Sequence, residues 1–332
     1  MADRMKSNLK LTSARISVVF PLLVFTVLLL LPSAGMTRNA VSLLFATFVW
    51  TITSVAWNLL GGFTGQTSFG FAVFYGLGAY TTGLMINAGR SPYFSFIAGA
   101  GVAVLASFLV GLPTFRLRGP YFAIATIGIT EAVRVVMSNV KITGGASGLN
   151  IIERKPFQQV EHYYTALVAL ALAVVVSIVI AKSRFGLALR AVKLDQDAAA
   201  DLGVNPYMSK LWVHAIAAAL TAIAGGIHAR YAVFIDPGGG PGGVFAFQTA
   251  ISILLMPVIG GIGTIWGPVL GGAIFGIVED QLVVKFPNLH LLMYGVLLIL
   301  IILLEPDGLA GILRRLFRFF RSASWRSLKS PA

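Results

Sequence analysis

Apolar runs of about 20 residues recur along this chain, and short segments that hold most of its charged residues separate them. A helix needs roughly 20 apolar residues to cross the hydrocarbon core of a bilayer, which is about 30 Å thick. Breaks at polar and Gly/Pro-rich segments predict about ten spans, at residues 16–32, 40–60, 66–87, 93–113, 119–138, 162–182, 211–234, 246–262, 264–284 and 289–304. We therefore expect an all-α fold, a polytopic transmembrane helical bundle in which residues 1–332 form one membrane-spanning domain.

The composition excludes a soluble globular protein. Hydrophobic residues make up 57% of the chain and charged residues only 11%, whereas a soluble domain carries about 25% charged residues. The net charge of +13 does not indicate a nucleic-acid-binding protein, because the basic residues lie between the apolar runs and form no single face. The chain has no cysteine, which excludes disulfides, thiolate metal sites and cysteine nucleophiles.

Lysine and arginine collect at both ends of the chain and in two internal loops. Short loops rich in these residues stay in the cytoplasm, so both termini are predicted to be cytoplasmic. The same rule places the loop with Arg116 and Arg118 and the long loop 183–210 inside. Loop 139–161 is then the largest segment on the outer side.

The two ends of the chain carry further signals. The basic tail, residues 305–332, alternates arginines with aromatic and leucine side chains, which suits a helix lying on an anionic inner leaflet. The first apolar stretch, from Ile16 to Leu31, precedes the small residues Ser33, Ala34 and Gly35. A cleavable signal peptide has this pattern and is an alternative to a first span, although its removal would put the basic clusters on opposite sides.

Two explanations fit the 36 glycines of the chain. Small residues let helices pack closely, whereas a glycine-interrupted helix can line a transport pathway. The segments 61–79, "GGFTGQTSFGFAVFYGLGA", and 260–276, "GGIGTIWGPVLGGAIFG", look alike. Interrupted segments at corresponding positions of two halves point to an inverted repeat with a central site.

Ionisable residues inside a span are costly unless they are paired or hydrated. Glu131 and Arg134 lie three residues apart in the span 119–138, on one helix face. They fit either a structural ion pair or the outer mouth of a pathway. The candidate pathway residues are Gly65, Gln66, Ser68, Glu131, Arg134, Thr143, Gly144 and Gly145.

The sequence predicts no catalytic residues and no metal site. The four histidines are scattered, without the spacing of a helical zinc motif. The chain contains no Gly-Lys dipeptide, so it has no Walker A loop and no nucleotide site of its own. An ion-coupled secondary transporter is the alternative from another class, but it would need ionisable residues at the bilayer centre, and the spans contain few.

The loop 183–210, "SRFGLALRAVKLDQDAAADLGVNPYMSK", has the pattern of a soluble helix between two spans. Phe185, Leu187 and Leu194 are among its apolar residues, and charged residues alternate with them, so the element is amphipathic and able to dock on a protein. Gly203, followed by an Asn-Pro pair, ends the predicted helix.

Within this loop, Asp197, Ala198, Ala199 and Gly203 resemble the EAA motif with which ABC importer permeases contact their ATPase subunits; Asp197 replaces the usual glutamate. Further blocks, including "RLRGPYFAIATIGITEAVRVV", "TGGASGL" and "SRFGLALRAVKLDQDAAADLGV", resemble the LivM-type branched-chain amino-acid permease family in family order. Many members read Ser-Leu-Gly-His where this chain has Ser68, Phe69, Gly70 and Phe71. The resemblance implies ATPase-coupling residues Arg184, Phe185, Gly186, Arg190, Asp195, Asp197, Ala198, Ala199 and Gly203.

The resemblance also implies a function and partners. The chain would be a permease subunit in a bacterial or archaeal inner (plasma) membrane. It would work with a LivH-type permease, two cytoplasmic ATPase subunits that bind ATP and Mg, and a periplasmic or extracellular solute-binding protein. Branched-chain amino acids are the expected cargo, with urea or short amides as the alternative.

Overall fold

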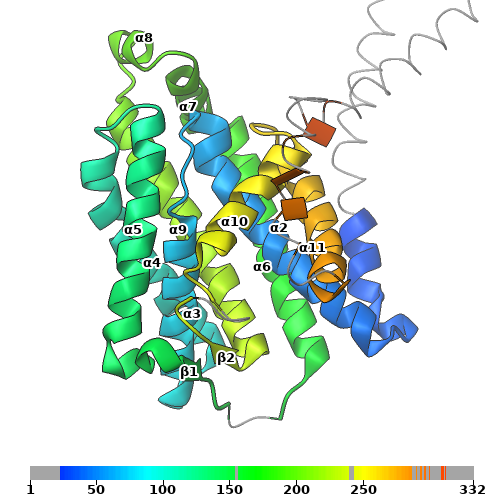
Figure 1. Ribbon diagram of the computed structural model, residues 1–332. Helices are drawn as coiled ribbons and strands as arrows, with labels where there is room; N and C mark the ends of the chain where they lie inside the picture. Colours follow the sequence, from blue (N-terminus) through cyan, green and yellow to red (C-terminus); the bar gives the residue numbers. More distant parts are fainter. Residues whose placement is uncertain are drawn as a thin grey trace, which may run out of the picture.

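Long helices run between the two ends of the molecule (Figure 1). The computed structural model describes residues 23–153, 156–238 and 243–285, with residues 289, 292–293, 295–296, 299, 308–309 and 311. After a helical stretch at 23–30, the elements are η1 (Pro32–Ala34), α2 (Arg38–Thr64), α3 (Phe71–Asn87), α4 (Pro92–Thr114), α5 (Pro120–Asn139), η2 (Lys141–Thr143), η3 (Gly145–Ser147), β1 (Leu149–Asn150), α6 (Gln159–Lys182), α7 (Arg184–Leu194), α8 (Gln196–Asp201), α9 (Pro206–Ala232), β2 (Phe234–Ile235), α10 (Phe247–Gly260) and α11 (Gly267–Lys285).

Five of the described helices, α2, α4, α5, α6 and α9, are long and apolar enough to cross a membrane. At 1.5 Å per residue each is at least about 30 Å long. Ile97, Leu105 and Leu109 on α4 are examples of large apolar side chains that point away from the bundle. Such an apolar surface is stable in contact with lipid and unfavourable in contact with water. The predicted membrane-type helical bundle is therefore confirmed for the described part of the chain.

The connections between helices alternate between two ends of the bundle. The α7/α8 end, at the top of Figure 1, also holds the turn before α5, because Arg118 contacts Asp197 of α8. The β end, at the bottom, holds the antiparallel pair of β1 and β2. Asn87, the last residue of α3, also lies there, since its side chain donates to Asn150 O at 2.8 Å.

Glycines bring α3 and α9 into contact at the centre of the bundle. A Cβ atom on Gly78 would overlap the backbone of Ala222, and one on Gly225 would overlap the carbonyl oxygen of Tyr75. Gly272 and Gly276 of α11 likewise lie against the backbone of α2. For these glycines the structure supports the helix-packing explanation.

The third predicted span, 66–87, was wrong at its start. Gly65 adopts a left-handed conformation with φ of +73° and ends α2, and the next helix begins only at Phe71. Residues 65–70 are therefore a non-helical break, which leaves α3 with 17 residues. The helix that contains the predicted span 211–234 begins earlier: α9 starts at Pro206, where Asn205 caps the helix and proline occupies its first turn.

The two similar glycine-rich segments do not form an inverted pair. Gly272 and Gly276 lie against Thr51 and Thr47 respectively, so α11 runs antiparallel to α2. α10 in turn runs antiparallel to α11, because Gly271 meets Met256 and Gly267 meets Gly260. The helix pairs α2–α3 and α10–α11 consequently run in the same direction.

Several predictions concern residues outside the described part of the chain. The first predicted span, 16–32, is described only from residue 23, and the last, 289–304, only at single residues and pairs. The basic N-terminal residues and nearly all of the tail 305–332 also lie outside it.

Candidate functional site

Two side-chain caps and one glycine shape the segment between α6 and α9 at the α7/α8 end. Ser183 Oγ accepts a hydrogen bond from Gly186 N at 3.1 Å and starts α7. Asp195 has an extended backbone and breaks the predicted single helix in two, and its carboxylate accepts hydrogen bonds from Asp197 N and Ala198 N at the start of α8. Gly203, with φ of +85°, ends α8.

Contacts with the transmembrane helices hold α7 and α8 in place. Asp197 forms two hydrogen bonds with Arg118, of 2.9 and 3.0 Å. Lys210 Nζ, buried in the first turns of α9, donates to Gln196 Oε1 at 3.1 Å. Arg190 lies over the ring of Phe63, 5.9 Å from its centroid.

The charges at this end affect one another. The Arg118 guanidinium holds the pKa of the Asp197 carboxyl below its ordinary value, mainly through their hydrogen bonds. Partial burial lowers the pKa of the Lys193 ammonium. Asp197 is therefore an ionised partner of Arg118 across the physiological pH range.

Leucine side chains project from α7 and α8 where no helix of the bundle covers them. Leu187, Leu194 and Leu202 are 64%, 88% and 83% exposed, whereas Leu189, Val192 and Ala199 are buried against the bundle. We call the three exposed residues the leucine surface. Exposed leucines beside charged residues on a polar segment are typical of a protein contact.

The predicted coupling residues divide into two groups in the structure. Gly186 and Ala199 are buried, and a Cβ atom on Gly186 would overlap Ile180 O. Phe185 is half-buried. The exposed residues are Arg184, Arg190, Asp195, Asp197, Ala198 and Gly203. All nine lie on this one segment.

The break at 65–70 holds three of the predicted pathway residues. Gly65 is exposed, and Gln66 and Ser68 are buried. Trp57 Nε1 donates to Ser68 O at 2.8 Å. Two hydroxyl groups of α5 bond the backbone of Phe69. Phe69 N donates to Thr126 Oγ1, and Thr130 Oγ1 donates to Phe69 O, both at 3.1 Å. In this non-helical break, Ser68 O and both backbone groups of Phe69 thus have protein partners.

The other predicted pathway residues lie further along α5 and at the β end. Arg134 Nε donates to Glu131 Oε2 at 2.9 Å, and its Nη2 donates to Oε1. Thr143 is buried and donates to Val140 O at 2.7 Å, and Gly144 and Gly145 have positive φ in the turn after it. The structure does not gather the eight predicted residues at one place.

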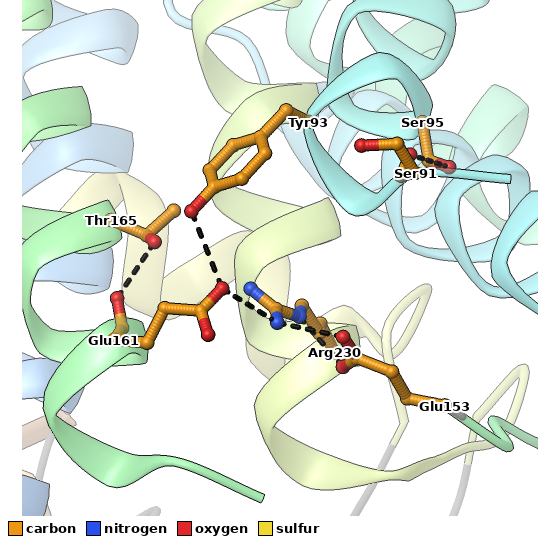
Figure 2. A network of polar contacts seen from close by, with 7 residues as sticks. All are labelled: Ser91, Tyr93, Ser95, Glu153, Glu161, Thr165 and Arg230. Carbon is orange, nitrogen blue, oxygen red and sulfur yellow. Dashed lines mark hydrogen bonds and ion pairs between the residues drawn. The ribbon is translucent and has the colours of Figure 1, made fainter. Parts of the chain in front are cut away.

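A buried arginine joins four segments at the β end (Figure 2). Arg230, in the last turn of α9, contacts Glu153 at 2.8 Å and Glu161 at 2.9 Å, and its side chain is 3% exposed. Tyr93 at the start of α4 donates to Glu161 at 3.3 Å. The segment before α6 is thereby fixed to α4, α6 and α9.

A second buried polar side chain fixes the turn between α10 and α11. Asn58 of α2 accepts from Gly263 N at 2.8 Å and donates to Thr264 O at 2.9 Å. The sequence analysis singled out neither Asn58 nor Arg230. Their positions in the sequence could have revealed them, since each is a polar side chain inside an apolar span and needs a partner there.

Within the described ranges, no three His, Cys, Asp or Glu side chains come together in a way that could hold a metal ion.

Five of the described helices, long and apolar enough to cross a membrane and joined in one bundle, define a multi-span membrane protein. The family model described as branched-chain amino acid transport system / permease component matches residues 39–302. This chain belongs to that permease family.

Individual relatives agree with the family. The high-affinity branched-chain amino acid transport system permease protein LivM of Escherichia coli K12 is 30% identical over 308 residues, which cover 83% of this chain and 71% of that protein. LivM of Salmonella typhimurium is 28% identical over the same shares. The permease protein LivH of Escherichia coli K12 is 32% identical over 139 residues, 41% of this chain and 42% of that protein. These relatives are transport permeases and not enzymes. No solved structure matches the chain.

Proposed function

We propose that this chain is the permease subunit of an ATP-driven ABC importer for branched-chain amino acids. Its family membership carries the proposal. ATP and Mg bind to separate cytoplasmic ATPase subunits, because this sequence has no phosphate-binding loop. The relatives LivM and LivH are both named as branched-chain amino acid permeases, and we extend that cargo to this chain.

The α7–α8 segment is the proposed contact with an ATPase subunit. The leucine surface supports this role, since three exposed leucines on a short polar segment are unfavourable in water and favourable at an interface. The nine predicted coupling residues lie on the same segment. Closure of two ATPase subunits would then move α7 and α8 against the bundle.

We propose that α5 faces the pathway, which lies between this chain and a LivH-type permease. α5 is the least buried of the five long apolar helices. Its exposed stripe includes Tyr121, Ile124 and the ion pair of Glu131 with Arg134. A paired charge on a surface that faces lipid is costly, whereas the same pair on a water-filled pathway or a protein interface is not. The break at 65–70 is bound to the opposite, buried face of α5 and so supports the proposed pathway wall from behind.

The proposed topology has about ten spans, with both termini and the α7/α8 end in the cytoplasm of a bacterium or archaeon. The β end then faces outward in the inner (plasma) membrane. The segment that Arg230 fixes, between α5 and α6, is the proposed landing surface for a solute-binding protein. A rigid surface suits such a partner, because ordering it on binding costs little.

A reconstituted complex tests the proposal. The chain would be purified with its LivH-type partner and ATPase subunits, inserted into liposomes, and assayed for ATP-dependent uptake of radiolabelled leucine, with urea in a parallel arm. Gly203→Ile should abolish uptake, because φ of +85° is strained for a branched side chain. Gly35→Ile is the matched control, since Gly35 has φ of +83° and open space around it. Failure of the ATPase subunits to co-purify would refute the proposal, and uptake of urea alone would change the cargo.

A further inference from the structure

The break at 65–70 and the turn between α10 and α11, a second break between helices, meet at the α7/α8 end. Gly62, near the end of α2, lies against the turn between α10 and α11, and a Cβ atom on it would come within 2.8 Å of Gly263 N. Gly65, where the first break begins, is three residues further on. The ends of α2 and α10 and the starts of both breaks therefore share one small region, which we call the junction.

Asn58 fixes the junction from within the bundle. Its side-chain amide bonds both Gly263 N and Thr264 O, so the α10–α11 turn is attached directly to α2. Gly263 has φ of +78°, which lets its backbone approach Gly62 without a side chain between them. The end of α2 and the turn before α11 are thus attached to each other directly.

Lys193, in the last turn of α7, reaches the junction from outside. Its ammonium group donates to Gly62 O at 2.9 Å, where the C-terminal end of α2 carries partial negative charge. Its Nζ would lie 3.0 Å from a Cβ atom on Gly263, and its Cγ 3.3 Å from a Cβ atom on Gly65. One side chain of the proposed ATPase-contact segment is therefore in contact range of both breaks.

Arg190 of α7 also lies over the ring of Phe63 at the end of α2, but the other hydrogen bonds of this segment lead elsewhere. Asp197 binds Arg118 before α5, Gln196 binds Lys210 in α9, and Arg190 Nη2 donates to Ala181 O at 3.5 Å at the end of α6. These contacts hold α7 and α8 to the helices beside them. Among the hydrogen bonds of the described residues, that of Lys193 is the one that runs from α7 to the junction.

We propose that Lys193 is a positioning residue for transport: it transmits movement of α7 to the break at 65–70 and to the α10–α11 turn. This inference rests on the proposed function, because α7 moves only if an ATPase subunit binds it. Lys193 acts through Gly62 and touches no substrate. A helix movement at one end of the bundle would in this way change two non-helical segments together.

The test uses the full complex in liposomes and compares amino acid imported per ATP hydrolysed. Lys193→Met keeps the length of the side chain and removes its donors. We expect ATP hydrolysis and subunit assembly to persist while import per ATP falls by roughly tenfold. Lys193→Arg should restore most of the import, since a guanidinium can donate to the same carbonyl. Lys182→Met is the matched control, because Lys182 is an exposed lysine in the last turn of α6 at the same end.

A labelling measurement distinguishes a loss of transmitted movement from a loss of protein stability in Lys193→Met. The chain has no cysteine, so single cysteines at Ile262 in the α10–α11 turn and at Thr67 in the break report each segment without background. Their reaction rates with a maleimide should change between the ATP-free and the ATP-trapped complex. In Lys193→Met both rates should stay at the ATP-free value although ATP is bound.

The outcomes separate this inference from the proposed function. Normal import per ATP in Lys193→Met, or an ATP-dependent change in labelling that survives the substitution, would overturn the role of Lys193 and leave the importer intact. A similar fall in import per ATP in the Lys182→Met control would also overturn it, since loss of any positive charge at this end would then be enough to uncouple import from ATP hydrolysis. If the wild-type chain fails to assemble with ATPase subunits, the proposed function itself is wrong.

Discussion

The guanidinium of Arg230 and the carboxylate of Glu153 form two hydrogen bonds, each 2.8 Å long, across 77 residues of sequence. Arg230 lies in the last turn of the long apolar helix α9, and Glu153 belongs to the segment that follows β1. A paired fork of this kind fixes orientation as well as distance. The segment between α5 and α6 is consequently attached to the bundle at its middle as well as at its ends.

Arg230→Met should loosen this segment. The substitution leaves Glu153 and Glu161 without their shared counter-charge, and because both carboxylates are partly exposed we expect a loss of roughly 1–3 kcal/mol of stability. Thermal unfolding in detergent and protease cleavage near residues 151–158 would measure it. Arg90→Met, at an exposed turn of the same end, should leave both unchanged. An unaltered cleavage pattern in Arg230→Met would contradict the attachment.

Gly225→Ala should destabilise the contact of α3 with α9. The added methyl group would overlap Tyr75 O, and overpacking of this kind costs about 1–3 kcal/mol. Gly101→Ala on α4 is the matched control, since its Cβ would meet nothing within 4 Å, and a helical Gly-to-Ala change there should be stabilising by up to about 1 kcal/mol. Midpoints of thermal unfolding that fail to move in opposite directions would argue against this account.

Asn58→Leu should release the α10–α11 turn. The leucine has nearly the same size but leaves Gly263 N and Thr264 O without their side-chain partner, at a cost of about 1–3 kcal/mol for each group that stays dry. We expect faster maleimide labelling of a cysteine at Ile262 in this variant. Asn139→Leu removes an exposed amide at the end of α5 and should not affect that rate. Equal rates in both variants would show that Asn58 does not hold the turn.

Asp197→Asn should reduce import without lowering thermal stability. The ion pair with Arg118 is solvent-exposed, and exposed pairs contribute little to folding stability. The pair nevertheless fixes the orientation in which α8 would meet the proposed ATPase subunit. Asp201→Asn, at the end of α8, is the control. Import by Asp197→Asn at the wild-type rate would mean that the pair has no part in coupling.

Acid should have the same local effect as Asp197→Asn. Arg118 lowers the pKa of Asp197, so the contribution of the pair is complete above the ordinary aspartate pKa of about 4 and is lost as the pH falls through the lowered value. A spin label on Ala200, exposed on α8, should become more mobile below that pH in the wild-type protein. In Asp197→Asn its mobility should be high already at neutral pH.

Sequence predicted the long apolar helices best, whereas the start of the third predicted span was wrong. Bilayer thickness sets the length of each apolar run, so α4 and α5 start and end within one residue of the predicted ranges. The break at 65–70 was not predicted, because its backbone is satisfied by Trp57, Thr126 and Thr130. Thr126 and Thr130 belong to a different helix, and they lie too far along the sequence for their contact with Phe69 to be predicted from it.

The candidate site was predictable in place and less so in detail. The amphipathic pattern located the α7–α8 segment, but it did not show that Asp195 divides the helix in two or that Asp197 pairs with Arg118. The roles of Lys193 and Arg230 depend on partners 131 and 77 residues away. A charge inside or beside an apolar run indicates that a partner exists, and only the fold identifies it.

The glycine contacts between α3 and α9 have a mechanical consequence. Because the backbone of Tyr75 lies directly on Gly225, and that of Ala222 on Gly78, the two helices cannot slide past each other without collision. Gly99 of α4 lies against the same stretch of α3. We therefore expect α3, α4 and α9 to move as one rigid unit, so that movement during transport is confined to the helices around them.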